Sequence, residues 1–216
     1  MKVLYLILLS VAISCNSDCF DCMRKYHLPE EKLEQGVVKK YRNQWANNTI
    51  IDYELFLQRN DEIQFYKFDS DFNIIRQEKI QVYSNYWEMK EQSFFDADSN
   101  EIPVELIMPS IITFTDDKSE YISKDRHLKD EDTWLTVTLT KKYIGKEQTI
   151  YNGEEIDCIR TSVNQLYEYS NKNFPYNKQT MKSTGYILSG ENIGVFYVSF
   201  AALGDTLTTK LMDILT

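Results

Sequence analysis

Four cysteines and two histidines are the residues whose types could support redox chemistry or bind a metal. Cys19 and Cys22 form a C-x-x-C pair, His27 follows it closely, and Cys158 lies far downstream. Only the C-x-x-C pair has zinc-ligand spacing, which argues against a zinc site. A redox pair would need to lie at the start of a helix in a βαβ unit, which this region lacks. In an oxidising export compartment we expect a structural disulfide, either from Cys19 to Cys22 or from one of them to Cys158.

Two acidic segments and one histidine are further candidates for chemistry. Residues 69–73 and 96–100 both match the D-x-D-x-N opening of a calcium loop, but both lack the glycine and the bidentate glutamate that such a loop requires. We expect both to be turns held by Asp and Asn side chains. His127 has no recognisable nucleophile motif beside it and is predicted to lie on the surface. No catalytic residue, metal site or cofactor is predicted.

The start of the chain has the pattern of an export signal. Lys2 precedes an apolar run over residues 3–13 that only Ser10 interrupts, and the small residues Ala12 and Ser14 precede a cysteine. Residues 1–14 are therefore predicted to be a signal peptide. The run is far shorter than the roughly 20 apolar residues of a membrane-spanning helix.

Residues 12–15 resemble a bacterial lipobox, in which the cysteine after the cut is acylated. Lipoboxes usually carry Leu where this chain has Ala12. Acylation of Cys15 would tether the mature chain to a membrane, whereas an ordinary secretory cut would leave Cys15 as a structural thiol. We predict an exported, lipid-anchored protein of the bacterial cell envelope, on the periplasmic side of a membrane or on the cell surface, with residues 15–28 as the tether and 29–216 as the folded domain.

Composition excludes several classes of function. The 216 residues, 43% of them hydrophobic, can bury a sizeable core. A net charge of -9 and a pI near 4.8 argue against a nucleic-acid partner. The 15 Tyr, 11 Phe and 3 Trp leave two interpretations open, an ordinary core or the lining of an apolar pocket on a concave sheet.

Periodicity predicts strands over much of the chain. Residues 51–58 alternate between a largely apolar and a mostly polar face, and residues 134–143 place Leu and Val opposite Thr. Such strands fit an antiparallel sheet with one solvated face. Residues 193–200 are apolar on both faces, so both should be covered. Asn152-Gly153 predicts a type I′ hairpin, and Ser189-Gly190 and Gly204-Asp205 predict two more connections of a hairpin meander.

Other segments are predicted to be helical or irregular. An apolar stripe at helical spacing follows Pro29, although residues 37–45 could equally begin the first strand; the stripe consists of Leu33, Val37, Tyr41 and Trp45. The charged residues 116–132 predict a solvated helix or a long loop. Two prolines place residues 102–112 in an irregular segment or at a sheet edge.

Four segments near the C-terminus support a family resemblance: residues 152–159, 183–187, 192–197 and 204–211. They resemble the C-terminal half of TapB-like exported lipoproteins, which are similar in turn to the LolA/LolB-type half-barrels that carry or sense lipids and lipoproteins. Asn192 replaces a glycine of the family pattern. The resemblance covers about the last 70 residues, and it implies a curved antiparallel sheet partly closed by helices and no catalytic residues.

These observations predict a mainly β protein with a single curved antiparallel sheet, a half-barrel built as a hairpin meander with one or two covering helices. The predicted function is non-enzymatic: binding of a hydrophobic ligand or of an envelope protein. A thiol redox or metal-binding protein that uses Cys19, Cys22 and Cys158 is the alternative.

Overall fold

The structure is a computed structural model, which describes residue 26 and residues 30–84, 86–113, 120–129, 132–174, 176, 178–202 and 205–215. In this part of the chain, one four-residue helix, α2 (Glu30–Leu33), precedes a single fourteen-stranded antiparallel sheet. The strands are β1 (Val37–Trp45), β2 (Asn48–Arg59), β3 (Glu62–Phe68), β4 (Ile74–Val82), β5 (Tyr86–Phe95), β6 (Glu101–Pro103), β7 (Glu105–Met108), β8 (Ile111–Thr113), β9 (Glu120–Leu128), β10 (Thr133–Tyr151), β11 (Glu154–Asn171), β12 (Lys178–Gly190), β13 (Gly194–Ala202) and β14 (Asp205–Leu215).

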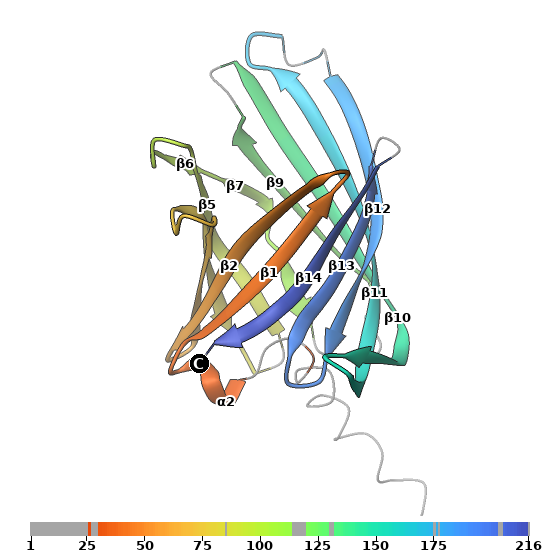
Figure 1. Cartoon of the computed structure of the whole chain (residues 1–216). Coiled ribbons are helices and arrows are strands. Elements are labelled where there is room, and N and C mark those ends of the chain that lie inside the picture. The colour runs from red at the N-terminus through yellow and green to blue at the C-terminus, as the bar shows by residue number, and fades with distance from the viewer. Residues whose placement is uncertain are drawn as a thin grey trace, which may run out of the picture.

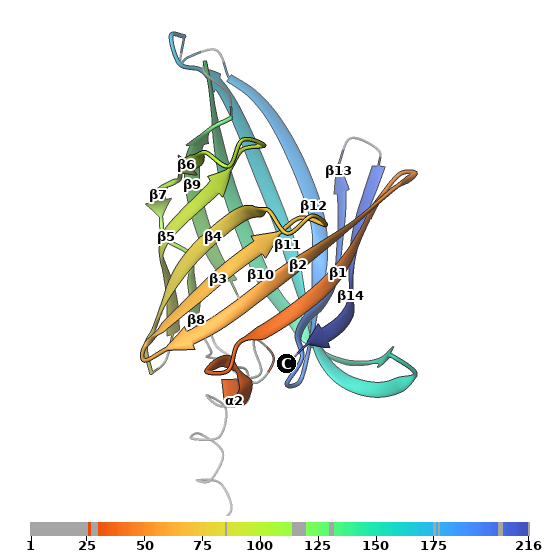
Figure 2. The same ribbon diagram turned by 60° about the vertical axis from the view of Figure 1, so that its left-hand side comes forward.

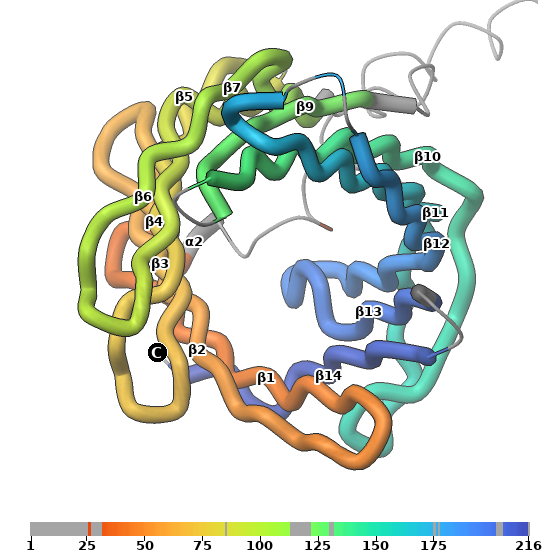
Figure 3. Tube along the Cα trace, turned by 90° about the horizontal axis from the view of Figure 1, so that it is seen from above, coloured from red at the N-terminus to blue at the C-terminus, as the bar shows by residue number. Residues whose placement is uncertain are grey.

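The strands curl into a nearly closed barrel (Figures 1 and 3). Strands that follow one another along the chain pair as hairpins from β1 to β6 and from β9 to β14, and β14 returns to pair with β1. The remaining seam lies between β5 and β9. There β6 pairs with β5, β7 pairs with β9, and β8 pairs with β5 again. Residues 102–112, predicted to be irregular or at a sheet edge, therefore connect the two sides of the seam.

One end of the barrel is filled by an apolar core. Helix α2 and the C-terminal end of β14 lie at this end, which we call the closed end (Figures 1 and 2). The buried side chains of the core are Tyr26, Leu33, Val37, Ile63, Trp87 and Ile159. We call the opposite end, where the β1–β2 and β11–β12 connections lie, the mouth.

The turns confirm the chemistry predicted from their residues. Asn152 and Gly153 both have positive φ, at 51° and 87°, as a type I′ hairpin requires. Asp69 Oδ1 accepts hydrogen bonds from the backbone N–H groups of Asp71 and Asn73, both at 2.9 Å. Asp96 organises the turn at 96–100 in the same way. These segments are Asx turns between strands.

Strands β10 and β11 are long enough to leave the barrel wall. A β-bulge between Tyr143 and Gly145 shifts the register of β10, and beyond it the two strands continue as a hairpin that projects from the closed end (Figures 1 and 2). Bulges bend a strand and increase its twist, which accounts for the change of direction. We call residues 145–158 the projecting hairpin.

Three expectations about the fold were wrong: the half-barrel, the covering helices, and the helix or long loop where residues 120–128 lie. The sheet closes much further than a half-barrel, and α2 is the only helix in the described ranges, so no helices cover the sheet there. Of the two alternatives for residues 37–45, the strand is found: they form β1. A spacing of four residues fits both alternatives, because it puts side chains on one side of a strand as well as of a helix. Residues 120–128 of the charged segment form β9. No helix among the described residues is long and apolar enough to cross a membrane.

Candidate functional site: a polar barrel lumen

Charged side chains cross the inner wall of the barrel in one row. Strand register pairs Lys39 with Glu54, Glu54 with Lys67, and Lys67 with Arg76, so a single row of side chains runs over β1, β2, β3 and β4. Directly paired residues project from the same face of a sheet. The row faces the lumen, because Arg76 lines the internal cavity described below.

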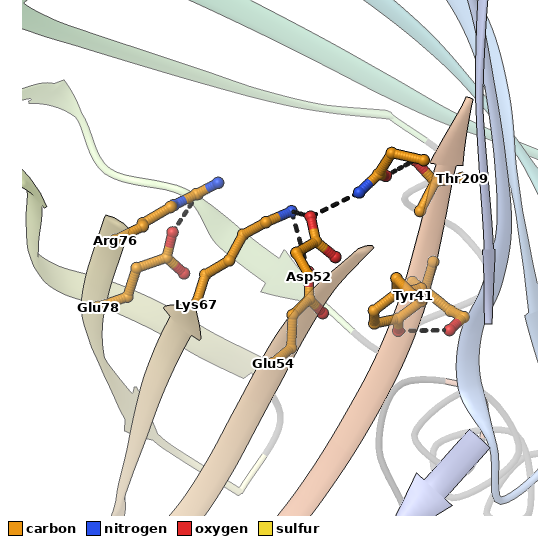
Figure 4. Close-up of polar contacts among 9 residues, drawn as sticks. Tyr41, Asp52, Glu54, Lys67, Arg76, Glu78 and Thr209 are labelled. Atoms are coloured by element: carbon orange, nitrogen blue, oxygen red, sulfur yellow. Dashed lines mark hydrogen bonds and ion pairs between the residues drawn. The ribbon is translucent and has the colours of Figure 1, made fainter. Parts of the chain in front are cut away.

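Asp52 is the centre of the hydrogen-bond network on this wall (Figure 4). Its carboxylate lies 2.7 Å from Lys67 Nζ and accepts a hydrogen bond of 2.6 Å from the amide of Asn43. The side-chain oxygen of Asn43, Oδ1, in turn accepts a hydrogen bond of 2.6 Å from the Thr209 hydroxyl on β14. Asp52 is only 4% exposed, so this network carries charge into the barrel interior and links β14 to β3.

Glu54 and Tyr41 experience the same low-polarity environment. Burial raises the pKa of Glu54, against the opposing effect of Lys67. Burial, together with the nearby Glu54 and Asp52 carboxylates, raises the pKa of Tyr41 well above its usual value. The Tyr41 hydroxyl donates a hydrogen bond of 2.8 Å to the backbone carbonyl of Val195. The phenol therefore remains a neutral donor that ties β1 to β13.

Lys39 is the most deeply buried cation of the row, with 1% of its surface exposed. Its Nζ donates a hydrogen bond of 2.6 Å to the Ile193 carbonyl and lies 5.4 Å from the centre of the Phe56 ring. Burial lowers the pKa of Lys39 to about 8, although Glu54 opposes the shift. The folded protein therefore releases this proton at a lower pH than the unfolded chain does.

This difference predicts a rise of stability with pH. Below pH 8 Lys39 is protonated in both states; between about 8 and 10.5 the unfolded chain holds the proton and the folded chain does not. The free energy of unfolding should therefore gain about 2 kcal/mol from Lys39 between pH 7.5 and 9.5. Urea denaturation at pH 7.5 and at pH 9.5 measures this gain in the wild type and in Lys39→Met. The other titrating groups are the same in the two proteins, so the difference between their pH slopes is the contribution of Lys39. Equal pH slopes in the two proteins would contradict the assignment.

The opposite wall combines apolar and polar side chains around an internal cavity of about 400 Å³. Asp125 and His127 of β9 and Lys141 of β10 contribute polar groups, while Val137 and Leu139 contribute apolar surface. Arg76 and Glu78 form an ion pair on its other side. We call this space the central cavity, and its lining is amphipathic.

Burial shifts the pKa values of Asp125 and His127 in the direction that favours their neutral forms. Burial raises the pKa of Asp125, and it lowers the pKa of His127, to which Arg76 adds. The His127 ring packs on Phe94 at 4.7 Å between centroids, and its buried Nδ1 has no hydrogen-bond partner among the residues that the structure describes. The prediction of a surface histidine was wrong, since His127 lines the central cavity.

A second cavity of 290 Å³ lies nearer the mouth. Its lining is mainly apolar and includes Trp45, Met181, Phe200 and Leu207. Gln165 and Tyr167 of β11 line both this mouth cavity and the central cavity. The two spaces are therefore neighbours along one lumen, with the apolar portion toward the mouth.

The sequence predictions for individual residues have different outcomes. Cys158 is fully buried, and burial raises the pKa of its thiol. Its pairing with Cys19 or Cys22 stays a prediction, as does acylation of Cys15, because these three residues lie outside the described part of the chain. The described residues include no group of three or more His, Cys, Asp or Glu side chains that could hold a metal ion.

The polar lumen was not predicted. In residues 51–58, Asp52 and Glu54 mark one face of the strand as polar, and that face was assigned to solvent, but it points into the barrel. The assignment was right for β10, whose Val137 and Leu139 face inward. The sequence signal that could have indicated a polar lumen is this acidic strand face, together with Lys39 and Lys67 on the strands before and after it.

Comparisons with known proteins identify the fold. No protein-family model matches the sequence, and no curated protein matches it. A candidate lipoprotein from Parabacteroides distasonis has a similar structure, with a TM-score of 0.58 and 12% identity over 88% of this chain and 98% of that one. A candidate exported protein from Bacteroides fragilis, described as having a YmcC-like fold, gives a TM-score of 0.55 and 10% identity over 83% and 95%. The chain therefore has the fold of these solved structures.

Proposed function

We propose that this is an exported, lipid-anchored envelope protein whose barrel lumen binds an amphipathic molecule without catalysing a reaction. The observation that carries the proposal is the pair of adjoining cavities, of 400 and 290 Å³, that share Gln165 and Tyr167. Cavities of this size are typical of small-molecule sites.

The lining favours an amphipathic over a purely hydrophobic ligand. The mouth cavity presents Trp45, Met181 and Phe200 to an apolar chain. The central cavity adds Asp125, His127 and other hydrogen-bonding groups. A polar group bound there would satisfy partners such as the buried His127 Nδ1, which a hydrocarbon would leave unpaired at a free-energy cost.

The charges of the lumen favour an uncharged polar group. Arg76 is paired with Glu78, and Lys67 with Asp52 and, at 3.7 Å, with Glu54. A charged ligand would have to disrupt one of these pairs and would leave a buried carboxylate, Asp52 or Glu78, without its cation, which is destabilising. A neutral head such as a glycerol ester requires no such exchange.

The position of the helix supports the proposed anchor geometry. Cys15 precedes α2 by fifteen residues, which can span about 50 Å when extended. Since α2 lies at the closed end, an acylated Cys15 would tether that end and leave the mouth free to face a partner or a ligand source. The resemblance to TapB-like and LolA/LolB-type proteins, and the description of one structural relative as a candidate lipoprotein, are consistent with this arrangement.

The alternative of a thiol redox protein receives no support from Cys158. A reactive thiol is accessible and has a lowered pKa. Cys158 is 0% exposed and its pKa is raised.

Native mass spectrometry of the protein purified from the membranes of the cells that produce it tests the proposal. We expect a mature chain that begins at Cys15, carries covalent acyl mass, and holds one non-covalent amphipath that denaturing solvent removes. A chain without acyl mass would overturn the lipid anchor. A chain without the non-covalent adduct, both as purified and after incubation with 1-decanoylglycerol, would overturn the lumen ligand.

A further inference from the structure

A separate cleft lies outside the barrel, under the projecting hairpin. Strand register pairs Arg160 with Leu188, Leu188 with Tyr197, and Tyr197 with Lys210, which places these four residues in one row across β11 to β14. Gln165 lines the lumen, and it is five residues from Arg160 on a stretch of regular pairing, so the row faces outward. The hairpin cleft, of 490 Å³, is bounded by this row and by Glu147, Thr149, Tyr151 and Asn152 of the hairpin.

Aromatic rings form much of the cleft surface. Tyr151 of the hairpin packs on Phe196 of β13 at 5.5 Å between ring centroids, and Tyr186 packs on Tyr197 at 5.7 Å. A bulge in the pairing of β12 with β13 brings Phe196 next to Tyr197 on this side. Aromatic faces of this kind offer flat apolar surface, and tyrosine adds a hydrogen-bonding hydroxyl.

Two cations flank the Tyr186 and Tyr197 pair. The Arg160 guanidinium lies 4.5 Å from the Tyr186 ring centre, and Lys210 Nζ lies 5.9 Å from that of Tyr197. Glu147, 3.4 Å from Arg160, is the acidic residue of the lining. The cleft is therefore locally positive on a chain whose net charge is -9.

The other polar groups of the cleft are neutral hydrogen-bonding partners at physiological pH. Burial, and then the neighbouring Tyr197 hydroxyl, raise the pKa of Tyr186, so its phenol stays protonated. Thr149 and Asn152 add a hydroxyl and an amide on the hairpin side. These groups can exchange hydrogen bonds with several hydroxyls of one ligand.

We propose that the hairpin cleft binds an acidic saccharide, meaning sugar rings that carry carboxylates. The half-buried rings of Tyr151 and Tyr197 would pack against the apolar faces of the sugar, and its hydroxyls would bond to Thr149 and Asn152. Its carboxylates would pair with Arg160 and Lys210, which lie on either side of the tyrosine pair, so that a ligand of more than one unit can reach both. The size of the cleft admits a short oligosaccharide segment.

Isothermal titration calorimetry with trigalacturonate, and with uncharged maltotriose, tests the proposal on the full mature chain. We expect one trigalacturonate per chain, maltotriose at least tenfold weaker, and a tenfold or greater loss for trigalacturonate in Arg160→Gln/Lys210→Gln. Lys146→Gln/Lys182→Gln is the matched control, since it removes two exposed charges outside the cleft lining and should bind within twofold of the wild type. No trigalacturonate binding by the wild type, or equal losses in the two double variants, would overturn the proposal.

The same variants separate this site from the lumen. Because Arg160 and Lys210 face away from the lumen, their replacement should leave the binding of 1-decanoylglycerol unchanged. Loss of both ligands in Arg160→Gln/Lys210→Gln would show a general loss of structure, and circular dichroism of the variant identifies that case. Tyr197→Phe, which keeps the ring and removes the hydroxyl, then provides the second test, with an expected threefold or greater loss for trigalacturonate; unchanged binding would overturn the role of the tyrosine pair.

Discussion

Replacing Asp52 by alanine is expected to lower the free energy of unfolding by about 2 kcal/mol, because it leaves the half-buried Lys67 without its main partner. Asp52 is 4% exposed and lies 2.7 Å from Lys67 Nζ. Without it, Lys67 keeps the more distant Glu54, at 3.7 Å, and the amide of Asn43 loses its acceptor. Urea denaturation at pH 7 gives the value, and Asp52→Asn, which keeps the shape, should lose less.

Glu91→Ala is the control for this prediction. The pair Lys79 and Glu91 has the same 2.7 Å separation, but the two side chains are 34% and 65% exposed. Exposed pairs contribute about 0 to 1 kcal/mol, so the control should change stability by less than about 1 kcal/mol. A loss in Asp52→Ala no larger than that in Glu91→Ala would show that the lumen network does not stabilise the barrel.

Replacing Gln165 by tryptophan is expected to abolish binding in the lumen, with at least a thirtyfold loss of affinity for 1-decanoylglycerol. Gln165 lines both internal cavities and accepts a hydrogen bond of 2.7 Å from Tyr167. An indole at this point would occupy the passage between the two cavities. Isothermal titration calorimetry measures the loss without interference from tryptophan fluorescence.

Asn164→Trp is the matched control, because Asn164 is the preceding residue on β11 and its exposed side chain projects from the other face of the strand. It introduces the same side chain outside the barrel and should bind the probe like the wild type. Undiminished binding by Gln165→Trp would exclude the lumen as the binding site.

The hairpin meander could be predicted because its signals are local. Asn152 and Gly153 have the positive φ that their turn requires, and Asp69 and Asp96 hold their turns by bonds within five residues. Strand β10 could be predicted because Val137 and Leu139 alternate with threonines. These elements depend on near neighbours in the chain.

Closure of the barrel could not be predicted in the same way. It depends on pairing between β1 and β14, from Val38 with Leu215 to Trp45 with Leu207, across most of the chain length. The resemblance to half-barrels implied a more open sheet. Strand β9 was not recognised because its inward residues Ser123, Asp125 and His127 are polar, so it lacks the apolar alternation of a strand that faces an oily core.

The lumen was missed for the same physical reason. Alternation shows that a strand has a polar face, and for a closed barrel that face can point inward when ion pairs such as Asp52 with Lys67 satisfy it. The sequence of one strand does not contain this information. It emerges only when neighbouring strands bring opposite charges into one row.

A crystal structure of the protein with 1-decanoylglycerol would show directly whether the barrel lumen binds an amphipathic molecule. We expect electron density for the acyl chain between Met181, Phe200 and Leu207, and for the glycerol beside Gln165 and Tyr167. Density for the ligand only on the outer surface of the barrel, with the lumen filled by water or by rearranged side chains, would contradict this expectation.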